Sequence, residues 1–183
     1  MEQEKATGNT YEFNSKDFMR SFIGVLKTVL VKPSDFYQNM PTTGGYPSPL
    51  TFLAVCLGVS GIFAIIITGG DVLMFFKVVI AGVIFSFIGA AILHLIAQQF
   101  FEGKGAYEGV YRVVAYAGAV NILTWIPVVG FIAGLYGLYL QIVGIEKVHK
   151  ITAGQAVVTV LITFAVYLIM ALVVGGVFFG IHF

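Results

Sequence analysis

Charged residues are missing from four long stretches of this 183-residue chain. No Asp, Glu, Lys or Arg occurs in residues 49–70, 78–101, 113–145 or 151–183. A helix needs about 20 apolar residues to cross the hydrocarbon core of a bilayer, which is about 30 Å thick. Each stretch is long enough, and a hydrophobic fraction of 58% would give a soluble chain of this size an apolar surface. We therefore predict an all-α, polytopic membrane protein.

Other absences exclude classes of function. The chain has one cysteine, Cys56, so an intramolecular disulfide is impossible. It has no glycine-rich phosphate loop, no nucleophile elbow and no carboxylate inside an apolar stretch, so we expect neither an enzyme nor a cofactor. A net charge of +1 gives no reason to expect a nucleic-acid partner. The first 17 residues contain no apolar signal-peptide segment, so we expect insertion to begin with the first internal span.

The breaks between apolar stretches predict five spans. Residues 113–145 would reach about 50 Å as one straight helix, so we expect the chain to turn at Trp125-Ile126-Pro127. Thr152 and Gln155 have the spacing of a capping box, which predicts the start of the last helix. The predicted spans are residues 50–68, 75–101, 107–125, 128–144 and 155–179 of a transmembrane domain at 50–183. Glycines such as Gly130 and Gly134 are expected to allow close packing between them.

A different kind of helix is predicted before the first span. Residues 1–15 are polar and are expected to form a mobile cytoplasmic tail, and residues 16–49 an amphipathic helix followed by a proline-rich loop. This helix is too short and too charged to span, so we predict that it lies in the membrane interface. The alternative is that its apolar face packs against the bundle. The candidate membrane-surface contacts are Lys16, Phe18, Arg20, Phe22, Leu26 and Lys27.

The positive charges predict the orientation. Five spans would place one basic residue, Lys77, on one side and nine on the other: Lys5, Lys16, Arg20, Lys27, Lys32, Lys104, Arg112, Lys147 and Lys150. Because loops rich in Lys and Arg stay in the cytoplasm, we expect a cytoplasmic amino terminus and a carboxyl terminus outside.

The order of several loose motifs resembles the Yip family of membrane proteins (Ypt/Rab-interacting proteins) in its prokaryotic form. These motifs are Pro33-x-x-Phe36-Tyr37-x-x-Met40, Phe101-Glu102-Gly103-Lys104-Gly105-Ala106-Tyr107 and His149-Lys150-Ile151-Thr152. The resemblance covers about residues 18–180 and implies a five-span protein of the prokaryotic plasma (inner) membrane. Eukaryotic members bind Rab-type GTPases and act in vesicle transport. The Asp-Leu-Tyr-Gly-Pro segment of several such members is absent here, so we do not extend Rab binding to this chain.

Polar residues within the spans are candidates for function because their burial in lipid is costly. His94, Gln98, Arg112 and Gln141 all fall in the predicted cytoplasmic half, where they would line a polar cavity of a small transporter or channel. In the competing interpretation, which we favour, Arg112 snorkels and pairs with Glu108, while the other three hydrogen-bond between helices.

The histidines give little indication of a metal site. His94 and His149 would need Glu102 or Glu146 as a further ligand, and no pair of these residues has ligand spacing. The leading hypothesis is a non-catalytic membrane scaffold or interaction partner. Its expected partners are the bilayer and another membrane protein or a second copy of itself.

Overall fold

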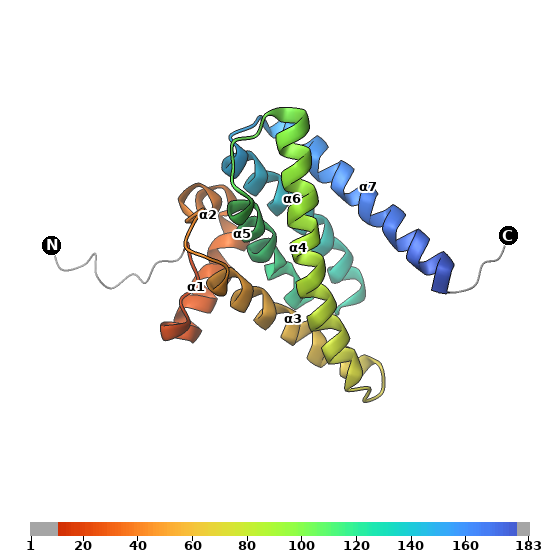
Figure 1. The fold of residues 1–183 in the computed structure, drawn as a ribbon. Helices are drawn as coiled ribbons and strands as arrows, with labels where there is room; N and C mark the ends of the chain where they lie inside the picture. Colours follow the sequence, from red (N-terminus) through yellow and green to blue (C-terminus); the bar gives the residue numbers. More distant parts are fainter. Residues whose placement is uncertain (1–10, 179–183) are drawn as a thin grey trace, which may run out of the picture.

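The computed structural model describes residues 11–178, and all of its regular structure within that range is helical. Figure 1 shows the helices in chain order. A short 3-10 helix, η1 (Ser15–Asp17), precedes α1 (Phe18–Val31) and α2 (Pro33–Asn39). Longer helices follow: α3 (Pro47–Ile67), α4 (Leu73–Phe101), α6 (Pro127–His149) and α7 (Ala153–Phe178). Between α4 and α6 lie α5 (Tyr107–Ala117) and a second 3-10 helix, η2 (Gly118–Leu123). The all-α prediction is confirmed.

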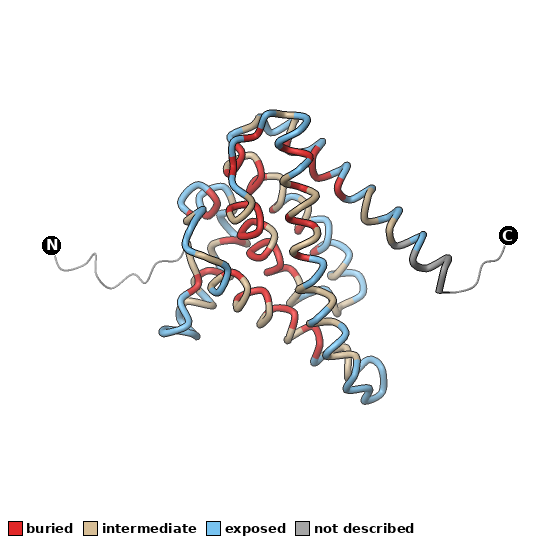
Figure 2. Tube along the Cα trace, viewed as in Figure 1, coloured by how far each residue is buried: buried red, intermediate tan, exposed pale blue. Residues whose placement is uncertain are grey.

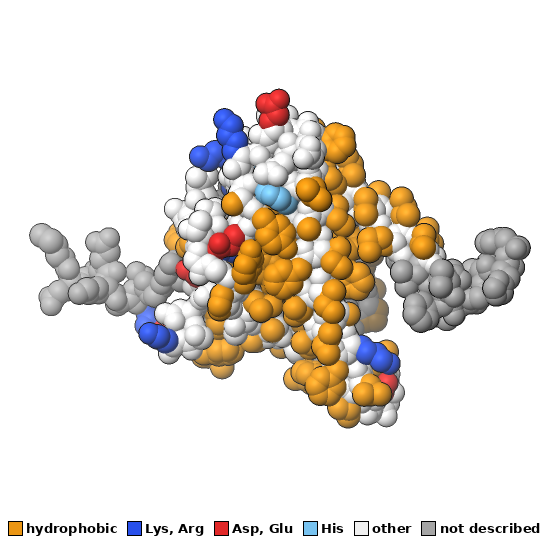
Figure 3. Space-filling model, in the orientation of Figure 1, with side chains coloured by type: hydrophobic (Ala, Val, Ile, Leu, Met, Phe, Trp, Pro, Cys, Tyr) orange, Lys and Arg blue, Asp and Glu red, His pale blue; other side chains and the backbone are white. Residues whose placement is uncertain are grey.

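Four helices are long and apolar enough to cross a membrane: α3, α4, α6 and the Ala153–Met170 part of α7. Only 22–33% of the residues in their most apolar stretches are buried inside the protein. Figure 3 shows hydrophobic side chains over the middle of the visible face, with charged side chains toward its edges and ends. So much exposed apolar surface is unfavourable in water, whereas it is compatible with the hydrocarbon core of a bilayer. The structure therefore supports an integral membrane protein.

The region of the predicted third span has a different form. Residues 107–123 are divided between the eleven residues of α5 and the six of η2. Most of them are buried, and Figure 2 shows buried backbone concentrated in the centre of the bundle. Neither helix alone has the length of a span, so the structure gives four candidate spans where the sequence predicts five.

Prolines and caps set the helix starts. Pro33, Pro47 and Pro127 each occupy the first turn of a helix, where the missing N–H costs no hydrogen bond. The predicted capping box is present: Thr152 N donates to Gln155 Oε1 at 2.9 Å, and Gln155 N donates to Thr152 Oγ1 at 3.3 Å. The observed ends of α3, α4 and α7 lie within three residues of the predicted ones, whereas α6 continues five residues beyond its predicted end at 144.

Helix α1 packs against the bundle through one face. Val25 and Val29 are fully buried, and the Phe22 ring lies 5.2 Å from that of Phe52 near the start of α3. The Tyr136 hydroxyl of α6 donates to the Leu30 carbonyl of α1 at 2.6 Å. Figure 1 shows α1 and α2 together at the end of the bundle where α3 begins. The α1 helix is therefore fixed to the domain.

The turn from η2 into α6 is held by a close approach at Gly130. A Cβ added there would lie 2.5 Å from the Thr124 carbonyl oxygen and 2.9 Å from its carbon. One turn later, a Cβ on Gly134 would have nothing within 4 Å. Of these two residues, only Gly130 is thus required as glycine for packing.

We expect Gly130→Ala to lower the free energy of unfolding by about 1–3 kcal/mol, because backbone must move to admit the methyl group. Gly134→Ala is the matched control and should have no destabilising effect, since alanine is the better helix former. Fluorescence of Trp125, which stacks on Phe63 at 3.7 Å, reports unfolding in mixed micelles. Equal losses in the two variants would contradict this account of the turn.

Candidate functional site

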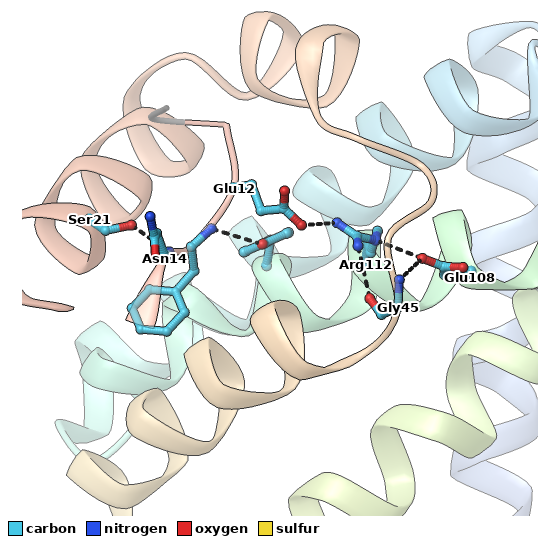
Figure 4. Close-up of polar contacts among 8 residues, drawn as sticks. Glu12, Asn14, Ser21, Gly45, Glu108 and Arg112 are labelled. Atoms are coloured by element: carbon cyan, nitrogen blue, oxygen red, sulfur yellow. Dashed lines mark hydrogen bonds and ion pairs between the residues drawn. The ribbon is translucent and has the colours of Figure 1, made fainter. Parts of the chain in front are cut away.

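Arg112 is the one Asp, Glu, Lys or Arg side chain among the described residues that is buried, with no exposed surface. Its Nη1 donates to Glu12 Oε1 at 2.7 Å and its Nε to Glu108 Oε1 at 3.3 Å. Its Nη2 donates to the Gly45 carbonyl at 2.8 Å, and Gly45 N donates to Glu108 Oε1 at 2.6 Å. Figure 4 shows these contacts converging from three segments of the chain. The guanidinium therefore ties the amino-terminal segment and the α2–α3 loop to α5.

The segment before α1 continues this attachment. Phe13 is 1% exposed, its N–H donates to the Tyr116 hydroxyl at 3.1 Å, and its ring lies 6.3 Å from that of Phe52. The Tyr11 hydroxyl donates to Asp35 at 3.0 Å, and this hydrogen bond raises the pKa of Tyr11. Residues 11–15 belong to the predicted mobile tail, but the part of it that the structure describes is packed on the domain. Residues 1–10 lie outside the described range.

A second cluster surrounds His149 at the end of α6. Its Nδ1 accepts a hydrogen bond from Gly105 N at 3.2 Å, and its carbonyl accepts one from Lys104 N at 3.1 Å. A Cβ on Gly105 would lie 2.7 Å from the Val148 carbonyl oxygen, and one on Gly103 would collide with the His149 ring. These contacts explain why the 102–106 loop needs two glycines: it lies directly on the end of α6.

A search against family models identifies the chain. The model described as the Yip1 domain matches residues 27–175, which is most of the sequence. The chain belongs to the Yip1 domain family. This confirms the resemblance noted from the motif order. No curated protein and no solved structure matches the chain.

The match covers the His149 cluster and part of the Arg112 cluster of this Yip1 protein. Arg112 and Glu108 lie inside the matched region, whereas Glu12, Phe13 and residues 18–26 of α1 precede it. The amino-terminal attachment is therefore a feature of this chain that the family model does not describe. The Yip1 family is not a known enzyme family.

The four candidate cavity residues of the Yip1 protein lie in different places. Arg112 is in its own cluster, Gln98 is exposed, and Gln141 lines a cavity of about 260 Å³ between α3, α4, α5, η2 and α6. His94 instead faces His149, with ring centroids 5.4 Å apart. The predicted Arg112–Glu108 pair is present, but the arginine is enclosed by protein and does not reach solvent. The structure thus does not bring the four residues around one cavity.

His94 and His149 are 55 positions apart in the sequence, so their spacing does not predict that the two rings meet. The His94 Nδ1 and His149 Nε2 atoms are buried and have no hydrogen-bond partner among the described residues. No group of three or more His, Cys, Asp or Glu side chains in the described part of the chain could hold a metal ion. The contact between His94 and His149 is one of the arrangements that the sequence allows, but no spacing rule identifies it.

The candidate membrane-surface residues divide between two environments. Phe22 and Leu26 are half-buried and pack against the core. The others, Lys16, Phe18, Arg20 and Lys27, are exposed. Met19 and Ile23, which are not among these candidates, are 66% and 54% exposed. They lie next to the buried stripe of α1, and a helical wheel alone does not separate such flanking positions from buried ones.

We expect Arg112→Ala to destabilise the Yip1 protein by about 3 kcal/mol, because two carboxylates and a carbonyl lose their shared donor. Release of the amino-terminal segment should also speed tryptic cleavage at Lys16, which is exposed. Thermal denaturation and timed proteolysis in detergent measure the two effects. Glu146→Gln is the control, since it breaks the half-buried pair with Lys147, which solvent still screens, and should cost less than about 1 kcal/mol. Similar results for both variants would contradict the role given to Arg112.

Proposed function

We propose that this Yip1 protein is a non-catalytic membrane scaffold or interaction partner whose working surface is the cytoplasmic end of the bundle. The observation that carries this proposal is the outer flank of α1. The helix is anchored by Val25 and Val29, yet it leaves Met19 and Ile23 exposed beside Lys27. Apolar side chains next to basic ones are typical of a helix that lies in the headgroup region of a bilayer. One helix would thus contact the bundle and the membrane surface together.

A fifth crossing by α5 and η2 fits this proposal. Eleven α-helical residues followed by six 3-10 residues reach about 28 Å, because the 3-10 helix rises about 2 Å per residue. That length is close to the hydrocarbon thickness of about 30 Å. The short segment is also surrounded by longer helices, and irregular backbone is tolerated at membrane depth when protein covers it.

Five crossings would place the amino terminus in the cytoplasm of a prokaryotic cell and the carboxyl terminus outside. The basic loops support this orientation, since Lys104 and Lys150 fall at one end of the spans and Lys77 near the other. The proposed partners are the bilayer and another membrane protein or a second copy of the chain. No feature of the described residues favours a Rab-type GTPase or nucleic acid, and the proposal includes neither.

The five-crossing topology predicts which loops share a side. Single cysteines at Thr124, Gly70 and Lys104 are introduced after replacement of Cys56 by alanine. An impermeant maleimide added to intact cells should label the Thr124 and Gly70 positions but not the Lys104 position. Labelling of the Thr124 and Lys104 positions from the same side would show that α5 and η2 do not cross, leaving four spans.

If α1 lies in the membrane interface, a polarity-sensitive dye attached to its outer flank should contact lipid. Dyes attached to cysteines at Met19 and Ile23 should show blue-shifted emission in vesicles and be quenched by lipid-borne quenchers. A dye at Ser34, an exposed polar position of α2 next to Asp35, is the control and should report water. Emission typical of water at Met19 and Ile23 as well would contradict the proposed membrane contact.

A further inference from the structure

A polar cavity of about 490 Å³ lies where α2, the 102–106 loop and the end of α6 meet. Three lysines line it, from two separate parts of the chain: Lys104, Lys147 and Lys150. Gln38 and Thr42 add polar side chains, and none of the described residues lining the cavity is acidic. The cavity therefore combines concentrated positive charge with space for a small anionic group.

Two of the lysines are available to a ligand. Lys147 Nζ is bound to Glu146 Oε1 at 2.9 Å, so its charge is partly balanced. Lys104 and Lys150 are exposed, and neither forms an ion pair with a carboxylate of residues 11–178. Tyr37, which also lines the cavity, adds no negative charge, because burial raises the pKa of its hydroxyl well above the ordinary value. Within the described range, no carboxylate thus balances the charges of these two lysines.

Lys150 occupies a position that glycine would fill more easily. It follows the last residue of α6 and has a φ of 56°, in the left-handed region that L side chains rarely adopt. Strained residues of this kind persist where the surrounding structure holds them, and they cluster at ligand sites. The lysine side chain is thus kept at a helix end where the backbone alone favours glycine.

The cavity also lies at the depth of phospholipid headgroups. The candidate spans α4 and α6 end at Phe101 and His149, directly beside Lys104 and Lys150. Basic pockets at the ends of membrane helices bind anionic headgroups, and lysine recognises phosphate as a compact point charge. A free phosphate carries the same chemistry, but only a lipid is held at this depth by its own acyl chains.

We propose that Lys104 and Lys150 form a binding site for the phosphate group of an anionic phospholipid. The acyl chains would lie along the bundle, and Lys147, Gln38 and Thr42 would surround the headgroup. This site requires the chain to span a membrane. It does not depend on the scaffold role or on lipid contact by α1, which the dyes on α1 test separately.

The test measures fluorescence anisotropy of tail-labelled phosphatidylglycerol and phosphatidylcholine with the full chain in detergent. The wild-type protein should bind phosphatidylglycerol about thirtyfold more tightly, since each lysine near an anionic group contributes about fivefold. The double variant Lys104→Gln, Lys150→Gly should bind both lipids alike. Replacing Lys150 by glycine also relieves the left-handed backbone, so the fold should survive, which an unchanged thermal midpoint verifies. Lys77→Gln, near the opposite end of α4, is the matched control and should behave as wild type.

Two results would overturn the proposal. One is an unchanged preference for phosphatidylglycerol in the double variant. The other is an equal affinity of the wild-type protein for the two lipids. Inorganic phosphate at constant ionic strength distinguishes the source of the anion. Weak displacement of phosphatidylglycerol supports a lipid site, whereas displacement at equal concentration would assign the lysines to a free anion and reject the lipid.

Discussion

Hydrocarbon offers no hydrogen bonds, and this constraint organises the whole domain. The long helices α3, α4, α6 and α7 satisfy their own backbone and present apolar side chains outward. The segment between α4 and α6 cannot do the same, because it changes from α to 3-10 geometry and includes the only buried arginine of the described residues. It therefore occupies the centre, where neighbouring helices exclude lipid from its irregular backbone.

The buried guanidinium links this interior segment to the surface of the domain. A charge removed from solvent must be paired and hydrogen-bonded, and the partners of Arg112 come from far along the chain. Glu12 brings the amino-terminal segment onto the bundle, and Gly45 brings the loop before α3. The hydrogen bond between Phe13 and Tyr116 extends this contact, so the segment just before α1 is held against α5. This interior polar cluster thus fixes the segment before α1, while Val25 and Val29 hold the helix itself against the bundle.

Sequence reasoning succeeded where a single local cause determines the structure. Proline at the start of α6 and the Thr152–Gln155 box each act over a few residues, and the structure follows them closely. The Arg112–Glu108 pair was also predictable, because the two residues are four apart on one helix. The contacts of Arg112 with Glu12 and Gly45 were not predictable, since only the tertiary fold brings these residues together. The same holds for the lysine cavity, in which Lys104 lies more than 40 residues from Lys147 and Lys150.

Helix α4 has 29 residues and is about 43 Å long, well beyond the hydrocarbon thickness. It must either tilt strongly or extend past the hydrocarbon at one end. Both the tilt angle and the length that extends depend on the thickness of the bilayer. Its last turn carries the exposed Gln98, while its end is fastened to α6 through the 102–106 loop. A thinner membrane would therefore shift the end of α6 and the lysines beside it relative to the lipid surface. Bilayer thickness then becomes a physical variable to which the basic end of this domain responds.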